Sequence, residues 1–381
     1  MEKNRYYYID FLRVIAILMM FVFHVNMVFV AENDWHIKDV SSSNVLMELN
    51  YWMSSFRMPL LFLVSGFVSA ILLKKMNQRQ FFQQRFKRLI IPTVIWTFLL
   101  VAPQIYFERK LQGVDFNYLE FYRTFLKFEW YPKGNFHWLH LWFIPYLFCY
   151  NIISIPLASY LDKKSVKHRL EVFFNKDYSI VPIIILAIMP YTFLATRFQT
   201  TNDLINDWAR HSFFIFFVFI GVLMYKFPII LEQIERKRRV YFRIAFTLII
   251  FINVLRWNGW SPFDLWDNWI TKPQTYIFIA IKNINAWAWV FTSLGYGKKY
   301  LNKKSTLLAY CNQAVYPFYI LHQTIIVIIA YYVVQTPDNT AFKYAFLLLV
   351  CFSVCVLLYH LFIRPNNVMR FLFGMKKIKK G

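Results

Sequence analysis

Apolar blocks long enough to cross a membrane alternate along this chain with short polar segments. A helix needs about 20 apolar residues to span the hydrocarbon core of a bilayer. Ten blocks come close to this length or exceed it, at roughly residues 8–30, 46–73, 89–107, 138–161, 179–196, 211–231, 240–257, 273–296, 307–334 and 342–363. The pattern predicts an all-α integral membrane protein that forms a single bundle of about ten transmembrane helices.

The connecting segments differ in basic content, which predicts the orientation of the bundle. Of the 43 lysines and arginines, 29 lie in one alternating set of segments, which includes both chain ends, and only 11 lie in the other set. Because cytoplasmic loops carry the excess of Lys and Arg, we expect both termini in the cytoplasm. That arrangement requires an even number of spans, in agreement with ten.

The chain of 381 residues is 58% apolar and carries a net charge of +23. The basic residues cluster between apolar blocks rather than on a polar domain with stacking aromatics, which argues against nucleic-acid binding. No linker divides the sequence, so we expect one transmembrane domain over 1–381, with a basic cytoplasmic tail at about 364–381 that faces the lipid bilayer. The four cysteines lie in apolar blocks without metal-ligand spacing, and no metal site is expected.

Three ionisable residues interrupt the first block: Asp10, Arg13 and His24. Ionisable groups in a spanning helix are costly, and they usually face the bundle interior and mark a functional site. Eleven residues separate Arg13 from His24, which places them on one helix face within roughly 20° and about 16 Å apart along the axis. Asp10 lies one turn before Arg13 and is predicted to pair with it.

Two later blocks carry arginines whose function the pattern leaves open. Arg57 lies in FRMPLLFLVSGF, where it either belongs to a functional site or extends to the outer interface. Pro59 and Gly66 in the same block predict a kink and close helix packing. Arg85 and Arg88 lie one turn apart at the start of the third block, where they either bind phosphate groups from the cytosol or anchor the helix at the membrane surface.

Histidines mark two further blocks. His140 and Trp142 in HLWFIPYLF are candidates for an acceptor site, since imidazoles and aromatic faces suit hydroxyl-rich sugars, and they also fit an interfacial aromatic belt. His322 lies alone among apolar residues in YPFYILHQ, where it either supports chemistry or simply bonds to a neighbouring helix. None of these motifs is specific by itself.

Taken in order, the motifs YYIDFLRVIAILMMFVFH, FRMPLLFLVSGF, QRFKRLIIP, HLWFIPYLF and YPFYILHQ resemble the acyltransferase 3 family of integral-membrane O-acyltransferases. The arginine block, with Trp35 and His36, is most similar to the branch of the glucan succinyltransferases named glucan biosynthesis protein C. The resemblance implies a protein of the bacterial inner membrane that modifies a glycan of the cell envelope by O-acetylation or succinylation. It also implies acetyl-CoA or succinyl-CoA as the cytosolic donor and a carbohydrate hydroxyl as the acceptor.

The same resemblance implies roles for individual residues. His24 with Arg13 matches the essential pair of the first helix, and Arg85 with Arg88 matches the arginine pair before the third. Histidine titrates near neutral pH, so His24 is the expected general base, acting directly or through an acyl-histidine. The three arginines are then expected to bind acyl-CoA, with Asp10, Arg57, His140, Trp142 and His322 in supporting or acceptor-side positions.

A multi-span transporter or flippase for a polar or glycan-linked substrate is the alternative function, because buried Arg and His residues also line substrate and proton paths. Transporters of this kind usually contain inverted repeats with paired broken helices, and no such repeat is evident here. The sequence therefore favours the enzyme. The acyl group, the acceptor and the oligomeric state, including a homodimer, are left open.

Overall fold

The computed structural model describes residues 6–31 and 35–378, and these are helical apart from connecting loops and one isolated bridge between Trp130 and Phe136. Within the described ranges, nine helical segments are long and apolar enough to cross a membrane. They are Tyr7–Met27, Asn44–Leu73, Gln78–Leu111, Leu139–Leu161, Trp208–Lys226, Arg238–Leu265, Pro273–Tyr300, Thr306–Val333 and Thr340–Ile363. The predicted all-α membrane protein is confirmed.

The predicted span at 179–196 forms a shorter helix. It is α9, Ile180–Leu194, with 15 residues. At about 1.5 Å of rise per residue it extends roughly 22 Å, less than the core of about 30 Å. The structure therefore differs from the expected ten full spans by this one helix.

The described chain divides into two compact units, each made of separate sequence segments. Unit 1 contains Met1–Ala16, Ser55–Phe82 and Cys149–Ser305, and unit 2 contains Ile17–Ser54, Gln83–Phe148 and Thr306–Gly381. Four helices contribute residues to both units, and three of them are α1 (Tyr7–Met27), α2 (Asn44–Leu73) and α7 (Phe143–Leu161). α3, Gln78–Arg85, also begins in unit 1 and ends in unit 2.

Unit 1 is built around a close approach of α2 and α10. Besides α9, its own helices are α8 (Lys164–Phe174), α10 (Trp208–Lys226), α11 (Ile229–Arg236), α12 (Arg238–Trp257), α13 (Pro262–Leu265), η4 (Trp269–Thr271) and α14 (Pro273–Tyr300). A Cβ atom at Gly66 would lie 2.0 Å from the carbonyl oxygen of Val218, and one at Gly221 would lie 2.1 Å from that of Leu63. The predicted close packing at Gly66 is confirmed, and only glycine fits there.

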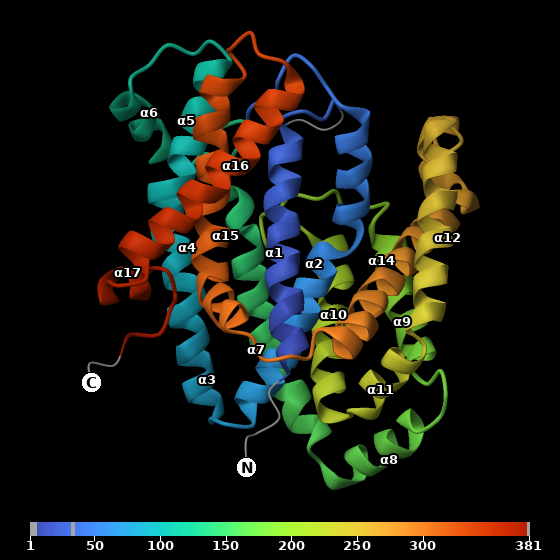
Figure 1. Ribbon diagram of the computed structural model, residues 1–381. Helices are drawn as coiled ribbons and strands as arrows, with labels where there is room; N and C mark the ends of the chain where they lie inside the picture. The colour runs from blue at the N-terminus through green and yellow to red at the C-terminus, as the bar shows by residue number, and fades with distance from the viewer. Residues whose placement is uncertain (1–5, 32–34, 379–381) are drawn as a thin grey trace. The chain divides into compact units, whose positions relative to one another are not determined.

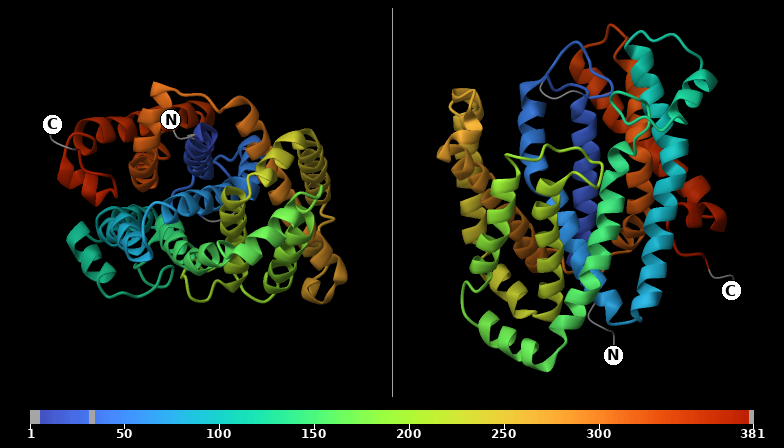
Figure 2. Two further views of the ribbon diagram at one scale, coloured as in Figure 1. Left: turned by 90° about the horizontal axis from the view of Figure 1, so that it is seen from below. Right: turned by 180° about the vertical axis from the view of Figure 1, so that it is seen from behind.

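Unit 2 holds most of the sequence motifs and is built around α15. Its own helices are η1 (Phe86–Ile90), α4 (Ile91–Trp96), η2 (Thr97–Val101), α5 (Ala102–Leu111), α6 (Tyr118–Phe125), η3 (Leu139–Trp142), α15 (Thr306–Val333), α16 (Thr340–Leu358), η5 (Tyr359–Ile363) and α17 (Asn367–Leu372). In Figure 1, α16 runs beside α15, and α5 lies beside α15 in the rear view of Figure 2. α15 therefore contacts α5 and α16.

Prolines explain three wide turns in unit 2. Pro92, Pro103 and Pro365 each lack the N–H that an α-helix would donate to the carbonyl four residues earlier. The π-helical turns η1, η2 and η5 begin six residues before these prolines and change the hydrogen-bond pattern locally. The first of these turns includes Arg88, so a predicted site residue lies on a wide turn.

Candidate functional site

Two histidines form the centre of the site in unit 2. The Nδ1 atom of His24 on α1 lies 2.8 Å from Nε2 of His322 on α15, and their rings stack with centroids 5.0 Å apart. The side chain of His322 is 1% exposed, whereas His24 is half-buried. The structure thus joins two residues that lie 298 positions apart in the sequence.

The orientation of His322 determines which nitrogen atoms carry protons. Its Nδ1 atom lies 2.6 Å from the backbone carbonyl oxygen of Tyr319, which can only accept a hydrogen bond. Nδ1 of His322 is therefore the donor, and in the neutral ring Nε2 accepts from Nδ1–H of His24. In this tautomer the lone pair of the His24 ring is on Nε2, which is the form a general base requires.

A buried hydrogen-bond network supports the histidine pair. His140 is 6% exposed, its Nε2 atom donates to the carbonyl oxygen of Ile320 at 3.1 Å, and its ring lies edge-on to that of His322. Gln104 on α5 donates to the Thr324 hydroxyl at 2.7 Å. Because buried polar networks hold their members in one arrangement, this network orients the α15 segment that carries His322.

A group of aromatic and acidic residues also adjoins His24. Trp35 stacks over the His24 ring, with centroids 6.3 Å apart and planes 15° apart. The next residue, His36, bonds to the carboxylate of Glu108, which is 5% exposed and also accepts from the Tyr131 hydroxyl at 2.8 Å. Aromatic faces and carboxylates are groups that can bind the apolar faces and hydroxyls of a sugar.

The arginine pair lies where α3 passes into η1. Arg85 is 8% exposed, and Nε of Arg88 donates to the carbonyl oxygen of Gly374 at 2.8 Å. Trp96 donates from its indole nitrogen to the carbonyl oxygen of Leu372 at 2.9 Å. Part of the predicted basic tail is therefore the helix α17, which packs against the segment that carries the arginines.

Residues of α15 lie near both the arginines and the histidines. Gly374 lies against both the Arg88 carbonyl oxygen and the Tyr316 ring, and His322 lies six residues after Tyr316 on the same helix. Six residues correspond to about 9 Å of helical rise, and each step of three, from Tyr316 to Tyr319 to His322, turns the side chain by about 60° around the helix. α15 thus places Tyr316 near the predicted donor residues and His322 against the predicted base His24.

The other predicted residues occupy different surroundings. Arg13 donates to Asp10 at 3.3 Å, which confirms the expected pair, and both residues belong to unit 1. Arg57 also belongs to unit 1 and is only 7% exposed, so protein encloses the side chain instead of leaving it extended to the membrane surface. Trp142 packs edge-on against Tyr146.

Sequence reasoning missed the polar residues that face the histidine pair. Gln104 and Glu108 lie one turn apart near the end of the third apolar block, and a glutamine inside such a block indicates a buried polar contact. Thr324 lies two residues after His322 and gives no comparable indication. Among residues 6–31 and 35–378, no three His, Cys, Asp or Glu side chains are placed to hold a metal ion.

Comparison with known proteins extends these observations to the whole chain. Residues 6–360 match the family described as an acyltransferase domain. Glucans biosynthesis protein C of Escherichia coli strain K12 is 23% identical over 393 residues, covering 99% of this chain and 96% of the relative. The protein of the same name from Shigella dysenteriae serotype 1 is 22% identical with the same coverage. No solved structure matches. The chain therefore belongs to the acyltransferase 3 family and is a multi-pass membrane acyltransferase.

Proposed function

We propose that this protein transfers an acetyl or succinyl group from acyl-CoA to a hydroxyl group of a glycan outside the cytoplasmic membrane, with His24 as the general base. The observation that carries the proposal is the contact between His24 and His322, whose geometry leaves the lone pair of His24 on Nε2. Family membership supports acyl transfer, and the relatives named glucans biosynthesis protein C support a glucan-type acceptor.

The proposed reaction needs one base at the point of attack. Nε2 of His24 removes the proton from the acceptor hydroxyl while the oxygen attacks the thioester carbonyl carbon. The new ester C–O bond forms, the C–S bond breaks, and His24 passes the proton to the leaving thiolate of coenzyme A. Transfer in this order is direct, and an acyl-histidine would instead require Nε2 to attack the thioester itself.

His322 acts in this scheme as a positioning residue. It accepts the Nδ1–H of His24 and stabilises the imidazolium that forms when His24 takes the proton. Its own ring is held by the Tyr319 carbonyl, and it lies edge-on to His140. The proposal therefore assigns to His322 the orientation of His24 that the sequence alone left unexplained.

Arg85 and Arg88 are the proposed binding groups for the phosphates of acyl-CoA on the cytosolic side. Guanidinium groups bind phosphate oxygens through paired N–H donors. The contact with Gly374 uses Nε of Arg88 and not its two terminal nitrogen atoms, which can still face a phosphate. Arg13 is proposed as a third donor contact, with Asp10 stabilising its charge.

Trp35 and Glu108 are the proposed acceptor contacts, since both adjoin the histidine pair through the loop that follows α1. Trp35 covers the His24 ring, and Glu108 is joined to the next residue, His36. A sugar ring that packs on Trp35 would place a hydroxyl near Nε2 of His24. His140, whose ring lies edge-on to that of His322, is the proposed supporting residue on the acceptor side.

The experiment measures acyl transfer by the purified protein in liposomes. Labelled acetyl-CoA or succinyl-CoA is supplied on the side of the membrane that the cytosolic face of the protein occupies. Mass spectrometry of envelope glycans from cells with and without the protein identifies the acyl group and the acceptor. His24→Ala should fold and lose transfer, whereas His168→Ala on the exposed face of α8 should retain it. Full activity of His24→Ala would contradict the mechanism.

A further inference from the structure

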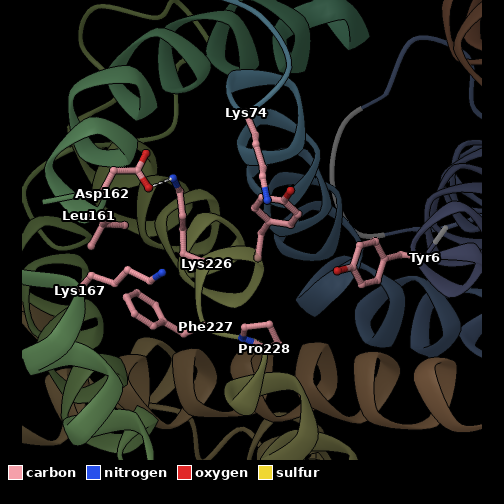
Figure 3. A pocket seen from close by; sticks show the side chains of 9 residues that line it. Tyr6, Lys74, Leu161, Asp162, Lys167, Lys226, Phe227 and Pro228 are labelled. Carbon is pink, nitrogen blue, oxygen red and sulfur yellow. Dashed lines mark hydrogen bonds and ion pairs between the residues drawn. The ribbon is translucent and has the colours of Figure 1, made fainter. Parts of the chain in front are cut away.

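A basic pocket of about 380 Å³ lies in unit 1 where four spanning helices end. Tyr6 precedes the first residue of α1, Lys74 follows the last residue of α2, Leu161 ends α7, and Lys226 ends α10. Figure 3 shows Lys74, Lys167 and the Tyr6 hydroxyl directed toward the open space between these helix ends. Because spanning helices end at the membrane interface, the pocket lies at the level of lipid headgroups.

The charge of the pocket favours an anion with two negative charges. Three lysines line it against one carboxylate, Asp162, which is already 2.5 Å from Nζ of Lys226. Lys74 and Lys167 are exposed, and the nearest acidic contact of Lys167 is a long, solvent-exposed pair with Glu171 at 3.8 Å. The lining groups therefore have an excess of two positive charges.

The remaining lining groups suit a phosphate attached to a lipid. The hydroxyl groups of Tyr6 and Tyr225 add two neutral hydrogen-bond donors for phosphate oxygens. Phe227 and Pro228 form an apolar side of the same pocket, as Figure 3 shows. The apolar side of the pocket would add nothing to the binding of a phosphate ion. The glycerol backbone and first acyl carbons of a lipid, in contrast, can pack against it.

We propose that this pocket binds the headgroup of a membrane lipid that carries a phosphate monoester. A monoester carries about −1.5 to −2 charges at neutral pH, which matches the excess of two lysines, whereas a phosphodiester headgroup carries one. Lysines near a membrane surface attract anionic lipids, and three lysines against one carboxylate in a single pocket favour the doubly charged headgroup. None of the residues that line the pocket is assigned a role in the proposed reaction, so the proposal does not depend on that reaction.

The test measures lipid binding to the full-length protein in nanodiscs of phosphatidylcholine that contain either phosphatidic acid or phosphatidylglycerol. Native mass spectrometry should show preferential retention of phosphatidic acid. The double variant Lys74→Gln/Lys167→Gln should bind phosphatidic acid on the order of tenfold more weakly. The control Lys75→Gln/Lys164→Gln removes the same charge from the neighbouring residues outside the pocket and should bind as the wild type does.

Three results would overturn the proposal. Equal retention of phosphatidic acid and phosphatidylglycerol by the wild type would remove the monoester preference. Equally weak binding of phosphatidic acid by both double variants would show that general surface charge, and not the pocket, explains the binding. Displacement of phosphatidic acid by inorganic phosphate or coenzyme A at comparable concentrations would assign the pocket to a soluble phosphate. None of these outcomes depends on acyl transfer, which the His24→Ala experiment tests separately.

Discussion

His24 and His322 share one hydrogen bond, and the backbone determines which of them donates. The Tyr319 carbonyl oxygen lies 2.6 Å from Nδ1 of His322, so Nε2 of His322 accepts from Nδ1 of His24 at 2.8 Å. A residue on α15 thus sets the tautomer of the proposed base on α1. This relation separates the role of His322 from that of a group that touches substrate.

Replacing His322 should reduce the rate of transfer without preventing substrate binding. His322→Phe keeps an aromatic ring but removes the acceptor of the His24 proton, so we expect kcat to fall by about ten- to a hundredfold with little change in KM. His24→Ala should cost more, within the range of about 10²–10⁴ that general base catalysis supplies. His322→Gln offers a carbonyl acceptor and should recover part of the loss. A kcat for His322→Phe equal to that of the wild type would show that the hydrogen bond is only structural.

Removing Arg85 should weaken donor binding. Arg85→Gln takes a buried guanidinium out of the proposed phosphate site, and we expect the Kd for acyl-CoA to rise by about tenfold, corresponding to roughly 1.4 kcal/mol. Calorimetry with the purified protein measures this directly. Arg79→Gln, on the exposed part of α3, removes the same charge and should bind normally. If both variants bind acyl-CoA equally well, Arg85 is a membrane anchor.

Removing Trp35 should affect the acceptor rather than the donor. Trp35→Ala deletes the ring that covers His24, and we expect KM for the glycan to rise by about tenfold while KM for acyl-CoA stays unchanged. Initial rates at varied concentrations of each substrate distinguish the two. Trp260→Ala, an exposed tryptophan of unit 1, is the matched control. A rise in KM for acyl-CoA alone would mean that Trp35 contributes to donor binding and not to acceptor binding.

The close contact in unit 1 predicts a stability effect. Gly66→Ala would place a methyl group 2.0 Å from the Val218 carbonyl oxygen, and the backbones of α2 and α10 would have to separate. Overpacking of this kind costs about 1–3 kcal/mol, so the melting temperature in detergent should fall clearly. Gly221→Ala, on the opposite helix, should have a similar effect. An unchanged melting temperature for both variants would contradict the helix contact.

Periodicity and charge predicted the helices because length and apolar content alone determine whether a helix can span a bilayer. The α9 segment differed because Ile180–Leu194 has the composition of a span but not its length. The positions of the π-helical turns before Pro92 and Pro103 could in principle be predicted from the sequence, because each proline removes one defined hydrogen bond. Sequence pattern does not determine whether the helix then kinks or widens.

The sequence predicted site residues only where a polar or ionisable residue lies within an apolar block. His24 and His322 stand out as histidines among apolar residues, and each was a candidate by itself. Their hydrogen bond was not predictable, because no spacing rule connects positions 298 residues apart in the chain. For the same reason, the contact between His36 and Glu108 could not be predicted from the sequence. Tertiary contacts between helices therefore decide which isolated polar residues belong together.

The contact between the carboxyl-terminal segment and Arg88 gives the last prediction. Gly374 has a φ of +64°, and a Cβ atom there would lie 2.5 Å from the Arg88 carbonyl oxygen and 2.8 Å from Cε1 of Tyr316. Gly374→Ala should displace the segment after α17 and increase the rate at which trypsin cleaves after Lys376, which is already exposed. Gly113→Ala is the matched control, because its φ of +84° carries the same backbone strain but nothing lies within 4 Å of the added atom. If the segment orders Arg88 for the donor, Gly374→Ala should also raise the Kd for acyl-CoA, whereas Gly113→Ala should leave it unchanged. Equal trypsin sensitivity in the two variants would mean that strain, and not the contact with Arg88 and Tyr316, explains the glycine.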